Sequence, residues 1–212
     1  MKEIYTLEKH LELNTKDNSI LLDTWRINKK RFEGILQSTI LSYPTYSLHD
    51  LSHSKTVIDN IECLLGKSGI EQLSLTDTWL ILNAALLHDW GMVLTDEKIQ
   101  EQIKSEQLNE FIEKNRFSND KSLSDAINDI ENIKKEQLAI VNAYSIRNSM
   151  VLILSEYFRG SHGENSHDYI IDNIFEKYNL SYDLIKGRII STLADIIVCH
   201  TRDIDNILKL PQ

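Results

Sequence analysis

Apolar residues recur every three to four positions along most of this chain, which is the pattern of amphipathic helices. The recurrence is clear from residue 18 to about residue 43, where Pro44 ends it, and again from Val57 to Leu65. Strand-type alternation is scarce, and the 212 residues include only 7 Gly and 2 Pro. The sequence therefore predicts an all-α fold.

One predicted helix is almost entirely apolar. Residues 80–87 have the sequence LILNAALL, and His88, Asp89, Trp90 and Gly91 follow them directly. A helix that is apolar on every side belongs in a core. His88 and Asp89 then lie at the edge of that core, where ionisable groups need hydrogen bonds or a metal ion as partners.

Residues 92–135 differ from their surroundings, because Lys, Glu, Gln, Asn and Ser predominate and apolar residues are widely spaced. This pattern predicts two exposed amphipathic helices that form an insertion and not a second domain. We expect a compact helical bundle, with residues 1–42 as an N-terminal helical extension and residues 43–212 as the main domain. We expect the central apolar helix to be capped by Thr76 or Asp77.

The formal net charge is −9, so bulk electrostatics cannot hold this protein on nucleic acid or on an anionic membrane. The first 13 residues are charged and lack the apolar segment of a signal peptide. No apolar run approaches the length of a membrane span. We therefore expect a cytoplasmic protein with no membrane partner and no bulk nucleic-acid binding.

Four of the seven histidines lie at or near the ends of apolar helical segments: His53, His88, His162 and His200. A helical bundle can direct side chains at such positions into one shared cavity. Four imidazoles and at least one carboxylate suit a transition metal better than calcium or magnesium alone. The alternative interpretation is a plain helical scaffold in which the histidines are structural.

The spacing of three of these residues resembles a known family. His53 lies in HDLSHSKTV at the start of a helix, and His88 and Asp89 follow 35 residues later in LLHDWGM. This pattern resembles the HD-domain superfamily of metal-dependent phosphohydrolases, over roughly residues 43 to 203. The HDWGM motif and residues 159–162 look most like HD domains of bacterial conflict (defence) systems, some of which are found beside chaperone-like ATPases.

The resemblance implies a role for each of these side chains. His53, His88 and Asp89 carry over as ligands of one metal ion, with Asp89 as the bridge to a second. His162 and His200 look like the two extra histidines of the binuclear branch of the superfamily. The implied cofactor is one or two divalent ions among Mn, Fe, Ni, Zn and Mg.

The superfamily has a further aspartate ligand, and two residues are candidates for it. Asp203 follows His200 by three residues and shares its face if the helix continues, whereas Asp195 precedes His200 by five residues, about 140° away on an ideal helix. A third alternative places this ligand outside the chain. A missing ligand favours a different function, a catalytically weak or inactive HD module that senses a ligand or binds a partner protein.

The activity that the resemblance implies is hydrolysis of a phosphomonoester or phosphodiester, foremost in a nucleotide or nucleotide second messenger. Two metal ions about 3.5 to 4 Å apart can activate water for attack on phosphorus. Asp89 and Arg159 are the candidate catalytic residues, and Arg159 would neutralise the charge of the phosphate. The expected partners are a phosphorylated small molecule and a protein such as a chaperone-like ATPase.

Overall fold

The computed structural model describes residues 5–15, 20–42, 51–93, 96–135, 143–178 and 188–203. Within these ranges the chain forms ten α-helices and one short 3-10 helix, and it contains no strand. The prediction of an all-α helical bundle is confirmed. None of the described helices combines the length and the apolar composition needed to cross a membrane.

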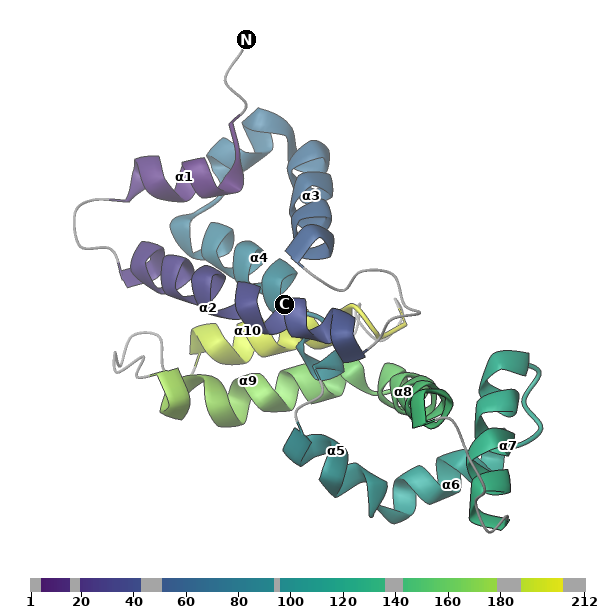
Figure 1. The fold of residues 1–212 in the computed structure, drawn as a ribbon. Helices are drawn as coiled ribbons and strands as arrows, with labels where there is room; N and C mark the ends of the chain where they lie inside the picture. Colours follow the sequence, from purple (N-terminus) through teal and green to yellow (C-terminus); the bar gives the residue numbers. More distant parts are fainter. Residues whose placement is uncertain are drawn as a thin grey trace.

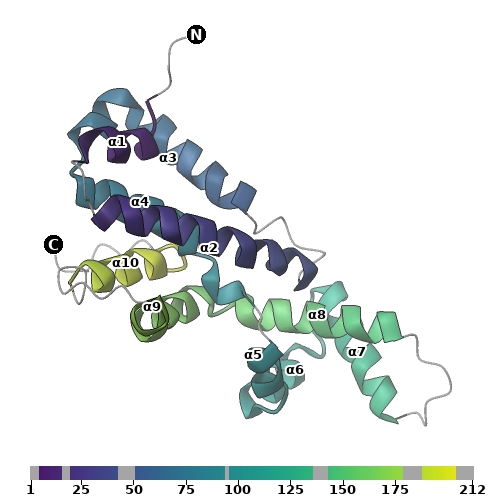
Figure 2. The same cartoon turned by 60° about the vertical axis from the view of Figure 1, so that its left-hand side comes forward.

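The N-terminal half of the bundle consists of α1 (Leu7–Asn14), α2 (Ile20–Ser42), α3 (Leu51–Gln72) and α4 (Leu75–Leu87). The other three helices all pack against α4 (Figures 1 and 2). The buried amide of Asn28 on α2 donates to Asn83 Oδ1 on α4 at 2.8 Å, and Trp79 Nε1 donates to Thr24 Oγ1 at 3.0 Å. The first two helices therefore share a core with the rest of the bundle, while a boundary at residue 42 stays a prediction.

The central helix α4 begins with a capping box. The hydroxyl of Ser74 accepts a hydrogen bond from the backbone N–H of Asp77, and the carboxylate of Asp77 accepts one from the N–H of Ser74, both at 3.1 Å. The prediction that Thr76 or Asp77 is the N-cap was wrong, because Asp77 acts from the third helical position, where a capping box places its acidic residue. The helix ends at Leu87, so His88 is its C-cap.

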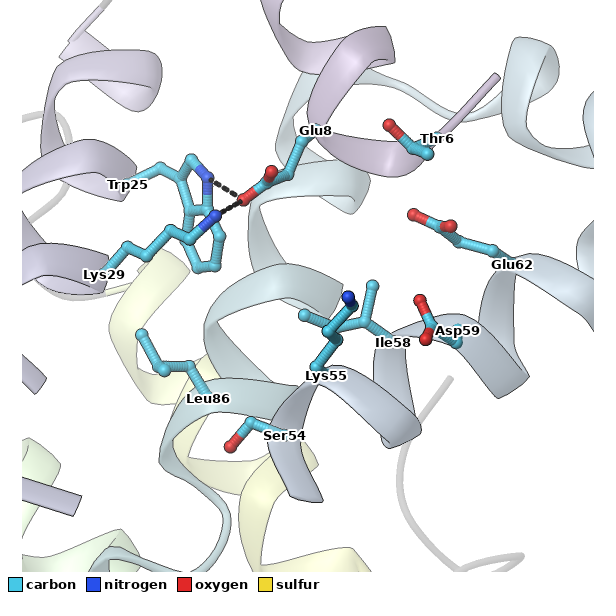
Figure 3. Close-up of a pocket in the computed structure, with 10 residues that line it drawn as sticks. All are labelled: Thr6, Glu8, Trp25, Lys29, Ser54, Lys55, Ile58, Asp59, Glu62 and Leu86. Atoms are coloured by element: carbon cyan, nitrogen blue, oxygen red, sulfur yellow. Dashed lines mark hydrogen bonds and ion pairs between the residues drawn. The ribbon is translucent and has the colours of Figure 1, made fainter. Parts of the chain in front are cut away.

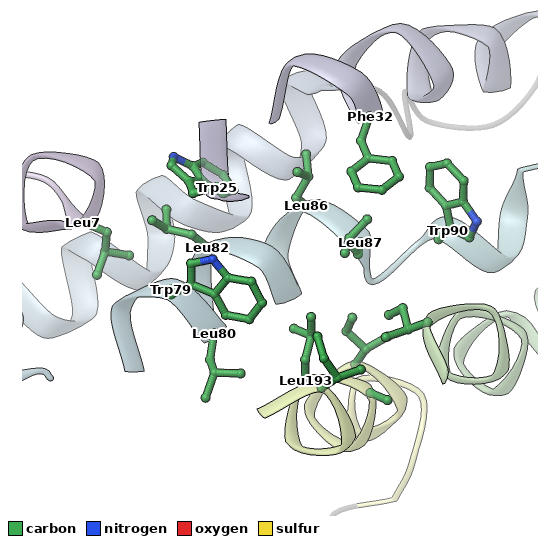
Figure 4. Close-up of a cluster of buried hydrophobic side chains, with 14 of the residues drawn as sticks. Leu7, Trp25, Phe32, Trp79, Leu80, Leu82, Leu86, Leu87, Trp90 and Leu193 are labelled. Atoms are coloured by element: carbon green, nitrogen blue, oxygen red, sulfur yellow. The ribbon is translucent and has the colours of Figure 1, made fainter. Parts of the chain in front are cut away.

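The C-terminal half consists of α8 (Ala143–Arg159), α9 (His162–Tyr178) and α10 (Arg188–Cys199). Helix α10 packs against both α9 and α4. The main core lies where α4 packs against α10, and Leu82, Leu87 and Leu193 are 1% exposed or less there (Figure 4). This packing brings the C-terminal end of α4 next to the ends of α9 and α10.

The segment that follows the central helix is more elaborate than predicted. It consists of η1 (Trp90–Met92), α5 (Asp96–Ile103), α6 (Glu106–Asn115) and α7 (Lys121–Lys135), so it holds three α-helices instead of two. The extra boundary arises because the hydroxyl of Ser105 accepts from the N–H of Leu108 and starts a new helix. Figure 2 shows these helices gathered beside α8, and they bury Leu108 and Ile127 in a second hydrophobic cluster.

Candidate metal centre

Four histidines and one aspartate meet where helices of the bundle end. His53 lies in the first turn of α3, and His88 is the C-cap of α4. His162 is the first residue of α9, and His200 directly follows α10. Asp89 lies between α4 and η1, and its side chain is only 9% exposed. Each helix therefore delivers one nitrogen ligand to a buried carboxylate.

The two carboxylate oxygens of Asp89 face different pairs of histidines. Oδ2 lies 2.9 Å from His88 Nε2 and 3.4 Å from His53 Nε2. Oδ1 lies 3.6 Å from His162 Nε2 and 3.9 Å from His200 Nε2. These five residues form two groups of three ligands that share Asp89, and within each group the ligand atoms lie within 4.8 Å of one another.

Backbone carbonyl groups set the orientation of three of the four imidazole rings. In each case Nδ1 bonds to the carbonyl oxygen of the residue three positions earlier, at 3.1 Å for His88 and 2.8 Å for His162, with the same contact for His200. A carbonyl oxygen can only accept, so Nδ1 carries a proton and, in the neutral form of the ring, Nε2 presents a lone pair to the site. This is the arrangement in which histidines bind metal ions.

The donor set fits divalent cations. The Nε2 atoms of His162 and His200 lie 2.8 Å apart, and their lone pairs repel one another unless a cation lies between or beside them. The Nε2 atoms of His53 and His88 lie 3.1 Å apart on the other side of Asp89. Imidazole nitrogens with one bridging carboxylate suit transition metals, so His53, His88 and Asp89 could hold one ion and Asp89, His162 and His200 a second.

The pKa values of His88 and His200 are shifted in opposite directions. Burial lowers the pKa of His88 by desolvation, but the hydrogen bond and charge of Asp89 outweigh this effect, so the pKa is raised. Burial lowers the pKa of His200, and repulsion from His88 and His162 lowers it further. The lowered pKa of His200 favours the neutral form that binds a metal ion, whereas Asp89 stabilises the protonated form of His88, with which a metal ion competes.

A family model described as HD-CE matches residues 43–212, well over half of the chain. The chain belongs to the HD-CE family. All five candidate ligands lie within the matched region, which contains an HD-type domain, whereas α1 and α2 precede it. No curated protein and no solved structure matches the chain significantly. The family and the donor set together fit a module of the metal-dependent phosphohydrolase type.

Sequence analysis missed a serine that connects the two halves of this HD-CE site. The Ser166 hydroxyl lies 2.8 Å from the carbonyl oxygens of both His88 and His162, and it accepts a 2.6 Å hydrogen bond from Gly91 N–H. Ser166 is completely buried on α9. Its place four residues after His162 is the only sequence signal for this role, because such residues share one face of a helix.

Two glycines permit the close approach of the backbone segments. A Cβ atom on Gly91 would overlap the carbonyl oxygen of His162 and lie 2.8 Å from its carbonyl carbon. A Cβ atom on Gly163 would overlap the hydroxyl of Thr201 and lie 2.8 Å from its methyl carbon. Glycine at these positions therefore lets the HD motif meet α9, and α9 meet the segment after α10.

A lysine of the insertion reaches the segment after the HD motif. Lys98 Nζ on α5 donates to the carbonyl oxygen of Gly91 at 3.2 Å and lies 4.7 Å from the centre of the Phe158 ring. Burial lowers the pKa of Lys98 by desolvation. Because Gly91 is two residues from Asp89, Lys98 connects the insertion to the metal-binding motif, a role that sequence analysis also missed.

The remaining predicted site residues lie elsewhere or act through the backbone. Asp195 and Asp203 are both exposed, and neither belongs to the two ligand groups found among the described residues. Arg159 ends α8 with an exposed side chain, and its carbonyl oxygen is the one that orients His162. The assignment of a phosphate-neutralising role to Arg159 stays a prediction.

Proposed function

We propose that this HD-CE domain hydrolyses a phosphomonoester or phosphodiester bond in a nucleotide or nucleotide second messenger, using divalent metal ions. The observation that carries the proposal is the division of the Asp89 carboxylate between two pairs of histidines. A shared carboxylate is the arrangement expected for two adjacent metal ions, and paired ions of this kind serve phosphoryl transfer to water.

Residues of this chain would bind the metal ions and orient the substrate. His53 and His88 would hold one ion and His162 and His200 the other, with Asp89 setting the distance between them. When bound, such ions polarise phosphoryl oxygens and lower the pKa of a water molecule. Arg159, three residues before His162, would bind a substrate phosphate oxygen, because a guanidinium group pairs strongly with phosphate. Ser166 would fix the backbone segments that carry His88 and His162 relative to each other.

Metal content provides the first test. Inductively coupled plasma mass spectrometry on protein purified without chelator should find up to two equivalents of Mn, Fe, Ni or Zn, or Mg after reconstitution. His88→Ala/Asp89→Ala should abolish the metal content while circular dichroism shows the helices intact. His167→Ala is the matched control, because this histidine pairs with Asp168 outside the site. Wild-type protein without metal, even after reconstitution, would overturn the proposal.

Activity provides the second test. The metal-loaded protein should release phosphate or a nucleotide product from at least one member of a panel of nucleoside phosphates, cyclic nucleotides and cyclic dinucleotides. The His88→Ala/Asp89→Ala variant should be inactive on the same substrate, and His167→Ala should retain activity. Equal turnover by the double variant would show that the activity comes from a contaminant or another site.

A second candidate function is a metal-binding module that senses a ligand and does not turn it over. The observation that favours it is the position of Asp195 and Asp203, which join neither ligand group among the described residues. Metal bound in stoichiometric amount, together with saturable nucleotide binding and no product, would support this function over hydrolysis.

We also propose, on the resemblance of the HDWGM motif and residues 159–162 alone, a role in bacterial defence beside a chaperone-like ATPase. Fold families host many functions, so this role needs its own test. Cells that express the protein with its neighbouring genes should resist bacteriophage, and Asp89→Asn should abolish the resistance. Resistance that is unchanged in the variant would separate any defence role from the metal centre.

A further inference from the structure

A cavity of about 390 Å³ lies between α1, α2, α3 and α4 (Figure 3). Small-molecule sites have volumes of roughly 300 to 1,000 Å³, so this cavity can hold a small ligand. Part of its wall comes from α1 and α2, which precede the region matched by the HD-CE family, and none of the five candidate metal ligands lines it. The lining residues used below are Trp25, Ser54, Ile58, Asp59, Glu62 and Leu86.

The cavity wall includes a serine that is nearly buried. Ser54 is only 4% exposed, and its side chain lines the cavity next to Lys55. No hydrogen bond to its hydroxyl occurs within the part of the chain that the structure describes. Among the described residues, Arg116 Nε is the only enclosed side-chain polar atom without a partner, so water can reach the Ser54 hydroxyl oxygen. Ser54 can offer a polar contact to a ligand but does not require one.

One acidic and one basic side chain of the cavity wall bind each other. Glu8 Oε1 accepts hydrogen bonds from Lys29 Nζ at 2.6 Å and from Trp25 Nε1 at 3.2 Å (Figure 3). Glu8 and Lys29 therefore form an ion pair, although the charge of Glu8 still acts on Glu62. They also fix the orientation of the Trp25 ring, whose apolar surface remains part of the wall.

The other charged side chains of the cavity wall are two carboxylates and one ammonium group. Glu62 accepts a hydrogen bond from the backbone N–H of Leu7 at 2.8 Å, and it has no cationic partner within the described ranges. Among the same residues, Asp59 and Lys55 make no hydrogen bond or ion pair. Two carboxylates thus share the cavity wall with the ammonium group of Lys55. Burial raises the pKa of Glu62, and the charges of Asp59 and Glu8 raise it further. An added positive charge would relieve this repulsion between carboxylates.

We propose that this cavity binds a small organic cation through an ammonium or guanidinium group that donates hydrogen bonds to Asp59 and Glu62. The apolar part of the ligand packs against Trp25, Ile58 and Leu86. Charge-assisted hydrogen bonds to carboxylates are among the strongest that a partly buried site can form. The site is separate from the metal centre, although both are built on α3 and α4.

The proposal can be tested by isothermal titration calorimetry on the full chain with agmatine, arginine, spermidine and citrulline. Citrulline has the arginine skeleton with an uncharged urea in place of the guanidinium group. At least one of the three cations should bind with a Kd of about 1 mM or tighter, and citrulline should not. Binding should persist in His88→Ala/Asp89→Ala, because the metal centre is not involved.

Isosteric variants locate the site. Asp59→Asn/Glu62→Gln should weaken binding about tenfold or more, because the loss of charge-assisted hydrogen bonds has effects of this size. The amide introduced by Glu62→Gln keeps an oxygen that can accept from the Leu7 N–H, and circular dichroism checks the fold. Asp172→Asn, which removes an exposed carboxylate on α9 outside the cavity, is the control and should bind normally.

Three outcomes would overturn the proposal. The first is no binding by any of the three cations. The second is equal binding of citrulline and arginine, because charge would then not be recognised. The third is unchanged affinity in Asp59→Asn/Glu62→Gln or lost affinity in His88→Ala/Asp89→Ala, because either result would place the cation outside this cavity.

Discussion

The hydroxyl oxygen of Ser166 lies 2.8 Å from the carbonyl oxygen of His88, although 78 residues separate them in sequence. The same hydroxyl contacts the His162 carbonyl and the Gly91 N–H, so one buried side chain connects the ligands on the two sides of Asp89. A group that orients metal ligands in this way influences metal affinity without contacting the metal ion.

Ser166→Ala should therefore weaken metal binding by about 10- to 100-fold. It should also lower the free energy of unfolding by about 1 to 3 kcal/mol, because the Gly91 N–H is left buried without a partner. The control is Ser155→Ala, another fully buried serine, whose hydroxyl bonds to the Val151 carbonyl within its own helix. Competition titration with a chromogenic chelator measures the affinity. Equal metal affinity in both variants would contradict the positioning role.

The two ligand groups predict distinct metal stoichiometries. His53→Ala and His162→Ala should each reduce the metal content from two equivalents to about one, because each removes a ligand from only one group. Asp89→Asn should weaken both sites, since both use its carboxylate. Mass spectrometric metal analysis of the three variants beside His167→Ala tests this. Complete loss of metal in His53→Ala with full retention in His162→Ala would instead indicate a single site.

The close approach of Gly91 to His162 predicts a penalty for any side chain at that position. Gly91→Ala should destabilise the protein by about 1 to 3 kcal/mol, because the new methyl group meets a backbone carbonyl that cannot rotate away. Gly34→Ala on α2 is the control, since a Cβ atom there meets nothing within 4 Å. Alanine in a helix should be neutral or stabilising there. Thermal unfolding of the two variants measures the difference. Equal melting temperatures would refute the predicted contact.

The raised pKa of Glu62 predicts a pH-dependent effect on stability. Burial is the main cause, and repulsion from Asp59 and Glu8 adds to it, so the folded protein disfavours the charged carboxylate. The resulting destabilisation is present at pH 7 and disappears as the pH falls through the folded-state pKa. Glu62→Gln should thus be more stable than wild type at pH 7, and the difference should shrink towards zero near about pH 4, close to the ordinary pKa of glutamate.

Urea unfolding at several pH values checks this prediction. The control is Glu110→Gln, which removes an exposed carboxylate of α6 that does not line the cavity. A Glu62→Gln variant that is less stable than wild type at pH 7 would show that the hydrogen bond to the Leu7 N–H outweighs burial. The same experiment with a bound organic cation should remove the advantage of the variant, because the ligand stabilises the charged carboxylate.

The sequence by itself was enough to predict the helices and the likeness to HD domains. Helical periodicity is a local property, so the nearly continuous apolar run before His88 was sufficient to identify the central helix and its burial. The positions of His53, His88 and Asp89 relative to predicted helix ends supported the HD-type interpretation, which the family match shares. The cap of α4 and the number of insertion helices depended on single hydrogen bonds at Ser74 and Ser105 and were predicted wrongly.

The resemblance to HD domains implied that Asp89 bridges two histidine pairs, but only the tertiary structure decided the geometry of the site and its supporting contacts. The division of the Asp89 oxygens between two histidine pairs depends on how α4, α9 and α10 pack, and periodicity does not specify that packing. The connection through Ser166 and the cavity beside Ser54 likewise join residues from helices that are distant in sequence. The physical reason is that a sequence pattern determines which face of a helix is buried, whereas the packing of several helices determines which side chains meet there.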